Sequence, residues 1–149
     1  MAITQAVCSS FKKELLDGDH SFKQTGGDTF KLALYTSSAT LNANTATYTT
    51  SQEVGASGTY SAGGKALVNT GTSVASAVAI TNFSNLSFTG VTITARGALI
   101  YNTTMGSGSN TTDAVVVLDF GSDKTATSGT FTIQFPAFTT AAAILRISG

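Results

Sequence analysis

Few side chains in this sequence have the types and spacing that acid–base or metal chemistry needs. The single histidine, His20, ends an Asp-Gly-Asp-His stretch that begins at Asp17. A histidine among acidic residues can bind a metal ion. A zinc site, however, needs four ligands, or three and a water, and one histidine with one cysteine cannot supply them. We therefore expect His20 to be a solvated turn residue rather than a metal ligand.

Two further candidates for catalysis also have plain structural interpretations. Cys8 is the only cysteine, and it is better explained as a small packing residue than as a nucleophile. Residues 119–121 spell the Asp-Phe-Gly tripeptide of protein kinases, but the glycine-rich loop, strand lysine and catalytic loop of that family are missing. We expect a strand that ends there and turns at Gly121-Ser122.

The acidic side chains form two close pairs along the chain, Asp17 with Asp19 and Asp119 with Asp123. Paired carboxylates can act in acid–base catalysis or bind calcium. No loop carries the alternating oxygen ligands of a calcium motif, so solvated turn carboxylates are expected. The sequence thus predicts no catalytic residue, no metal ligand and no residue that binds a cofactor or a small-molecule substrate, and we do not expect an enzyme.

The composition excludes several classes of protein. Of the 149 residues, 42% are hydrophobic and 11% charged, with eight basic and eight acidic side chains. A chain without a basic excess is poorly suited to bind nucleic acid by charge, and one without about 18 consecutive apolar residues has no predicted membrane span. One cysteine cannot form a disulfide framework. What remains is a neutral β-rich domain with many threonine and serine residues.

Charge is sparse in the middle of the chain. Residues 32–112 carry only Glu53, Lys65 and Arg96. Exposed surfaces of soluble proteins usually carry more charge than this. We infer that hydroxyl and amide groups solvate this segment, or that other subunits cover it.

The amino-terminal residues predict the only helix. Ser9 or Ser10 can cap it, since a hydroxyl accepts a bond from a free backbone N–H, and Gly18 is a typical stop. Residues 1–10 lack the basic and apolar regions of a secretory signal, so we expect the chain to stay in the cytoplasm or to assemble there.

We predict that this short helix forms an assembly interface. Phe11 and Leu15 share one helical face, with Val7 on it if the helix starts earlier, and Leu16 is a further apolar side chain beside them. A helix of two or three turns is marginal without docking. The helix needs something to dock on, either the domain or a neighbour, and the lead Met1–Val7 has no obvious core role. We expect residues 1–22 to be an amino-terminal arm that packs on a neighbouring subunit or on the shell of an assembly, while the β domain projects outward.

After Gly26-Gly27 the apolar period changes from helical to alternating, which predicts strands. A turn is expected around Asn69-Gly71, and a bulge or bend at Gly90. Residues 37–64 are expected to form a long loop with one short strand near Thr47–Glu53, and Asn102–Thr112 a flexible loop. The expected strands are Thr29–Thr36, Lys65–Asn69, Ala75–Thr81, residues 86–88, 91–95 and 131–135, Gly97–Tyr101, a buried central strand Ala114–Phe120, and Ala141–Ser148 with Ala143, Leu145 and Ile147 inward.

These elements predict an all-β fold, an antiparallel β-sandwich or a jelly-roll-like barrel of about eight short strands with one short amino-terminal helix. The chain is a single domain, 1–149. Within it, 1–22 forms the arm and helix, and 28–149 the β-sandwich.

Several blocks of the sequence together resemble a small virion structural protein of tailed bacteriophages, marine ones in particular. The blocks span nearly the whole chain in order. They are Ser9–Phe22, Asp28–Leu41, Glu53–Leu67, Ala95–Asn102 and Ala114–Pro136.

The resemblance implies a non-enzymatic component of a virus particle, assembled in the host cytoplasm. Its leading form is a capsid decoration (cement) protein that binds the major capsid protein or other virion proteins and itself, for example as a trimer. The alternatives are a tail, neck or baseplate subunit, or a β-sandwich carbohydrate-binding module for host recognition. Sugar binding usually needs aromatic platforms, but the chain has no tryptophan and its four tyrosines are scattered along it.

Overall fold

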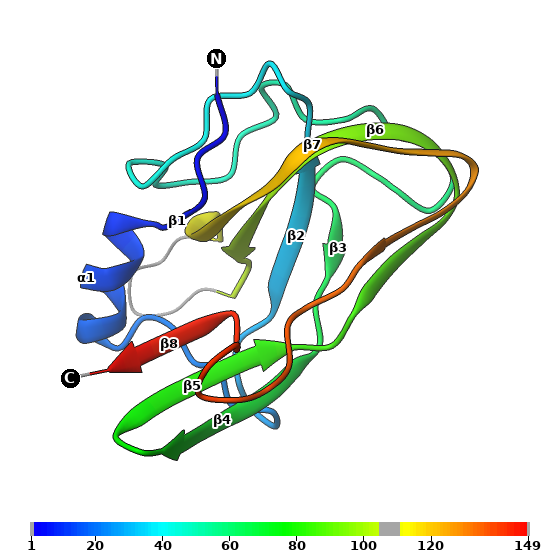
Figure 1. Ribbon diagram of the computed structural model, residues 1–149. Helices are drawn as coiled ribbons and strands as arrows, with labels where there is room; N and C mark the ends of the chain where they lie inside the picture. The colour runs from blue at the N-terminus through cyan, green and yellow to red at the C-terminus, as the bar shows by residue number, and fades with distance from the viewer. Residues whose placement is uncertain (1, 105–110, 149) are drawn as a thin grey trace.

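A computed structural model describes residues 2–104 and 111–148, which fold into two antiparallel sheets and one helix (Figure 1). The larger sheet has the order β1 (Ala6–Val7), β7 (Asp113–Ile133), β6 (Leu86–Asn102), β2 (Phe30–Tyr35) and β3 (Lys65–Ala66). The smaller sheet has the order β4 (Asn69–Ala75), β5 (Val78–Phe83) and β8 (Leu145–Ser148). The predicted all-β fold with one short helix is confirmed.

Strands β6 and β7 form the longest pairing and are not the short strands expected. They pair from Leu86 opposite Ile133 to Asn102 opposite Asp113. The predicted irregularity at Gly90 is confirmed, because the register shifts between Phe88 and Val91 and Gly90 has a φ of 63°. The pair bends together on the side away from the helix (Figure 1).

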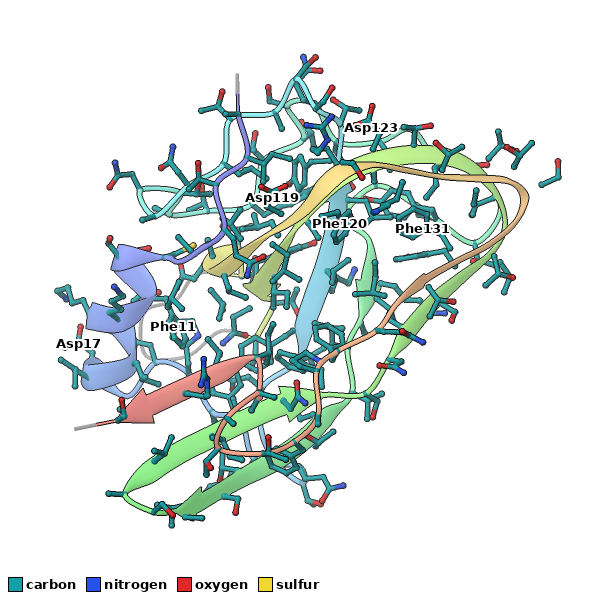
Figure 2. All side chains as sticks on the ribbon, viewed as in Figure 1. Phe11, Asp17, Asp119, Phe120, Asp123 and Phe131 are labelled. Atoms are coloured by element: carbon teal, nitrogen blue, oxygen red, sulfur yellow. The ribbon has the colours of Figure 1, made fainter. Side chains whose placement is uncertain are left out.

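Strand β7 also continues where the sequence predicted a turn at Gly121-Ser122. Only Arg96 separates the β6 residues that pair with Asp119 and Lys124, so the residues between those two on β7 form a wide bulge. The strand then curves until the rings of Phe120 and Phe131 lie 6.2 Å apart (Figure 2). A bulge therefore replaces the turn.

The smaller sheet differs from the expectation in its turn and in its last strand. The β4–β5 turn lies at Ser76-Ala77, both with positive φ, and not at Asn69-Gly71. Positive φ at two central residues matches the right-handed twist of a hairpin. Strand β8 begins at Leu145, and Ile147, expected inward, is 59% exposed.

The long loop of residues 37–64 is largely irregular, as predicted. The expected strand near Thr47–Glu53 is replaced by isolated bridges, Tyr35 with Glu53 and Thr47 with Asp113. The other predicted loop, Asn102–Thr112, includes residues 105–110, which lie outside the described residues.

Helix α1 (Ser9–Asp17) begins after Cys8, and no side chain caps it, in contrast to the serine cap expected. It ends as predicted, at Gly18 with a φ of 84°. This nine-residue helix is too short to cross a membrane, and no other helix in the described residues could span one.

The segment before the helix was expected to lack a core role, and the structure corrects this. Ile3 is buried, and β1 pairs with the central strand β7, Ala6 opposite Val117. The amino-terminal segment therefore packs in the same core as the β domain rather than extending from it as a free arm.

Candidate functional site

The four residues of the predicted assembly interface lie on one side of the molecule but differ in exposure. Phe11 points into the domain, is 3% exposed and packs against His20 and Phe22 (Figure 2). Val7 and Leu15 are half-buried against the core, and Leu16 is 90% exposed. Phe11 thus stabilises the domain's own core, and only Leu16 is fully available to another molecule.

All four residues line a groove of about 800 Å³ between α1 and the smaller sheet. Its walls are mostly apolar. The sheet side is formed by β5 and β8 with Thr72 of β4, and two basic side chains also contribute to the lining. The residues that line the groove include Val7, Phe11, Lys12, Leu15, Leu16, Arg146 and Ile147.

The far end of the smaller sheet leaves an apolar face uncovered beside this groove. Val74 pairs with Ala79, and Ala79 with Ile147, so these three side chains lie on one face. Leu145, two residues before Ile147, lies on the same face and is buried in the main core. Val74 is 71% exposed, so the inner face of this sheet extends beyond the core that covers its other end.

A buried polar network holds α1 to the larger sheet. His20 Nε2 lies 2.9 Å from Glu14 Oε1, and His20 Nδ1 lies 2.9 Å from Asn102 Nδ2. The side chain of His20 is 1% exposed and lies between the rings of Phe11 and Phe30. The prediction of a solvated turn histidine is therefore wrong.

The partners of Asn102 fix which ring nitrogen of His20 carries the proton. Asn102 Oδ1 accepts from the N–H of Thr104, and Asn102 Nδ2 lies 2.8 Å from Asp28 Oδ2. The amide NH₂ therefore faces His20 Nδ1, which acts as an acceptor. The proton lies on Nε2, where it is donated to Glu14.

The same proton arrangement disfavours a metal ion. Glu14, His20 and Asp113 bring ligand atoms within 4.8 Å of one another, the one such group in the part of the chain that the structure describes. A metal at Nε2 would displace its proton and require one on Nδ1, directly against the amide of Asn102. The network therefore suits a structural role, in which it holds α1 to the larger sheet. Burial, followed by the nearby Glu14, raises the pKa of Asp113, a residue that the sequence analysis did not single out.

A second polar cluster surrounds Glu53 in the long loop. Its carboxylate accepts hydrogen bonds from the hydroxyls of Tyr48 and Tyr60, at 2.5 and 2.6 Å, and from the N–H of Gly63 at 2.8 Å. The hydroxyl of Tyr60 also accepts a bond from the N–H of Leu34 on β2. One carboxylate thus joins the loop to the larger sheet.

The two other tyrosines complete this cluster. Tyr101 donates to the carbonyl of Gly63 at 2.6 Å, and Tyr35 donates to that of Thr49 at 2.6 Å. Burial and the neighbouring Glu53 raise the pKa of Tyr101 to about 12. Because the four tyrosines converge with most of their surface covered, they form a packed cluster rather than an exposed platform for a sugar ring.

Cys8 is packed and the carboxylates of Asp17 and Asp123 are solvated as predicted, although Asp17 lies in helix α1 and Asp123 in strand β7 rather than in turns. Cys8 is fully buried, and burial raises the pKa of its thiol to about 11, which disfavours the reactive thiolate. Asp17 forms an exposed ion pair with Lys13, and Asp123 forms one with Arg96. These carboxylates belong to the solvated surface.

Comparison with protein-family models, with curated proteins and with solved structures finds no match.

Proposed function

We propose that this chain is a structural protein of a bacteriophage virion, and in particular a capsid decoration protein that binds the major capsid protein and copies of itself. The observation that carries the proposal is the groove face. There Leu16 is 90% and Ile147 59% exposed beside a mostly apolar groove. Exposed apolar surface next to a hollow is typical of a protein–protein contact.

The charge distribution supports the same proposal. Residues 32–112 carry three charged side chains, and Glu53 is used internally by its tyrosine partners. Surfaces supplied by this segment are therefore weakly charged. Such surfaces avoid the large desolvation cost of unpaired charges when a neighbouring subunit covers them.

The side chains that could do chemistry are hydrogen bonded or buried inside the domain. Both ring nitrogens of His20 are hydrogen bonded, and the thiol of Cys8 is buried. These arrangements favour a structural role over a catalytic one.

The alternatives differ in where the protein is found. A tail, neck or baseplate subunit would use the same groove against another neighbour. A carbohydrate-binding module is the weaker proposal, because ring faces that would stack on a sugar are buried around Glu53.

Immunogold labelling of intact particles tests the proposal. Antibodies against the purified chain would be applied to phage particles made by cells that produce it naturally. We expect label over the whole head. Label at the tail alone would overturn the capsid assignment, and particles free of the chain would overturn the virion proposal.

The contribution of the groove is tested by the occupancy of single-residue variants on those particles. Leu16→Asp places a charge at the groove, and Val68→Asp places one at an exposed apolar residue outside the groove lining. We expect at least a tenfold loss of occupancy for the first and less than a twofold loss for the second. Deletion of residues 2–10 is a poor test because it removes the buried Ile3 and Cys8.

A further inference from the structure

The outer edge of β8 is an open sheet edge beside the groove. β8 is the last strand of its sheet, and it pairs with β5 on one side, Ile147 opposite Ala79. Within residues 2–104 and 111–148, no backbone hydrogen bond joins β8 to any other segment. An edge of this kind offers its free N–H and C=O groups to an added strand.

The other sheet edges are covered, irregular or very short. Beside β1, Thr4 donates its N–H to Leu41 and Ser9 to Ala43, so the loop covers that side. β4 has a register shift after Asn69, and β3 has two residues. Bulges and short length discourage pairing with another chain. β8 is regular and lies directly against a hollow.

The groove suits the side chains of an added strand. Alternate residues of a strand point to the same face. A strand beside β8 would therefore place every second side chain against α1, next to Ile147 and Leu16, which are largely exposed. That environment requires apolar residues at alternate positions.

The charges at the groove specify the partner further. Lys12 and Arg146 both contribute to its lining, and neither forms an ion pair in the described part of the chain. Arg146 donates to the carbonyl of Ala141, whereas Lys13, on the outer side of the helix, is paired with Asp17. Because side chains alternate along β8, Arg146 projects from the face opposite to Ile147, so the charges favour an occupant that carries a carboxylate on the face away from its apolar side chains.

We propose that an extended segment of a partner chain adds to the outer edge of β8 as a fourth strand of the smaller sheet, with alternate apolar side chains in the groove and a carboxylate on its opposite face, near Arg146. The proposal names the chemistry of the neighbour and rests on the proposed function. β-Strand addition supplies affinity through the backbone, and the groove supplies selectivity.

A synthetic peptide with these properties is the direct probe. The acetylated and amidated peptide Glu-Val-Thr-Val-Thr-Val-Glu would be titrated to millimolar concentration into the isotope-labelled full chain. By NMR, we expect shifts at Leu16 and Ile147, and amide exchange slowed at least tenfold at the alternate residues of 145–148 whose N–H groups face away from β5. The control is the same peptide N-methylated at every valine and threonine, which keeps the side chains but removes the donors.

Two variants of the chain test separately how the β8 edge and the basic side chains contribute to peptide binding. Ile147→Asp puts a charge on the inner face of β8, and we expect at least a tenfold weaker peptide affinity, against less than twofold for Val68→Asp. For Arg146→Glu, the affinity for the glutamate peptide should fall at least threefold, and a peptide with lysine in place of glutamate should bind more tightly than it does to the natural chain.

Three results would overturn the proposal. They are no binding at millimolar peptide, equal binding of the N-methylated peptide, and a dimer in analytical ultracentrifugation that Ile147→Asp abolishes, because that dimer identifies a second copy as the occupant. The peptide assay reads the β8 edge whether or not the chain is found in particles. Failure of strand addition and failure of the virion proposal are therefore distinguishable.

Discussion

Around Glu53, the charged and polar groups are hydrogen bonded to each other inside the domain. Beside α1, by contrast, apolar side chains are exposed and basic side chains form no ion pair in the described residues. The carboxylate of Glu53 accepts three hydrogen bonds, two of them from tyrosines. At the groove, Leu16 and Ile147 are exposed, and Lys12 and Arg146 form no ion pair in the described residues. The first region stabilises the fold and the second is available for a partner.

The two sheets differ in how completely their buried polar atoms are hydrogen bonded. The described residues contain four buried side-chain atoms without a hydrogen-bond partner: Ser10 Oγ, Asn69 Oδ1, Thr70 Oγ1 and Asn82 Oδ1. Three of the four lie on β4 or β5 of the smaller sheet. Unsatisfied polar atoms lower stability, so we expect the smaller sheet to be the less stable part of the domain.

The largest effect is expected from alkaline pH, which acts on the region around Glu53. Burial, and next Glu53, raise the pKa of Tyr101 to about 12, and the pKa values of Tyr35, Tyr48 and Tyr60 are raised as well. The fold favours the neutral phenols, so the contribution of these tyrosines to stability is constant below the unfolded pKa of about 10 and falls as the pH rises toward 12. Tyrosinate absorbance at 295 nm should appear together with loss of the β-sheet circular dichroism signal. Ionisation near pH 10 with unchanged circular dichroism would contradict this.

The next effect is expected from Glu53→Gln. Glutamine offers one acceptor oxygen, and its NH₂ faces donors, so at least one buried hydrogen bond to a charged group is lost. We expect the free energy of unfolding to fall by about 3 kcal/mol in urea denaturation. Tyr48→Phe, which removes a single donor from the same carboxylate, is the matched control and should cost about 1 kcal/mol. Equal losses for both variants would show that the carboxylate is not the centre of the cluster.

A smaller loss in the free energy of unfolding is expected when the polar network between α1 and the larger sheet is disrupted. His20→Ala leaves Glu14 and Asn102 without their shared partner and opens space beside Phe11, so we expect a loss of about 2 kcal/mol. Lys13→Ala, on the solvent side of the helix, should cost less than about 0.5 kcal/mol. Thermal unfolding measures both. A stable His20→Ala variant with unchanged protection of the helix amides would show that α1 is held by apolar contacts alone.

The smallest effect on stability is expected at the groove itself. Leu16→Ser replaces a side chain that is 90% exposed, so the free energy of unfolding should change by less than about 0.5 kcal/mol. Phe11→Ala, on the buried face of the same helix, should lower the free energy of unfolding by about 3 kcal/mol. A large loss for Leu16→Ser would mean that the groove belongs to the core and is not a binding surface.

The larger sheet could be predicted from the sequence where apolar residues alternate or form a continuous run. Ala114 to Leu118 are buried in a strand with neighbours on both sides, as expected. The turn at Ser76-Ala77 could not be predicted, because neither residue is a glycine or asparagine that favours positive φ. The continuation of β7 through Gly121 was also not predicted, because the glycine, serine and aspartate residues around it are typical of a turn.

The polar clusters were beyond sequence reasoning for a different reason. His20 and Asn102 are 82 residues apart, and Asp28 lies 74 residues from Asn102. Only the pairing of β2 with β6 brings these side chains together. Local composition around His20 suggested solvent, because its immediate neighbours in sequence are charged or small.

The position of the pairing strands has a consequence for how the chain folds. β1 pairs with residues 116–117, more than a hundred residues later, and residues 145–148 of β8 pair with β5 in the smaller sheet. Such non-local pairing makes folding slow, on a scale of milliseconds to seconds. During synthesis, α1 emerges early but lacks the strand that its neighbouring segment β1 needs, and the groove is complete only after residues 145–148 have left the ribosome. A nascent chain therefore presents no finished groove, and it cannot compete for a partner until those residues have emerged.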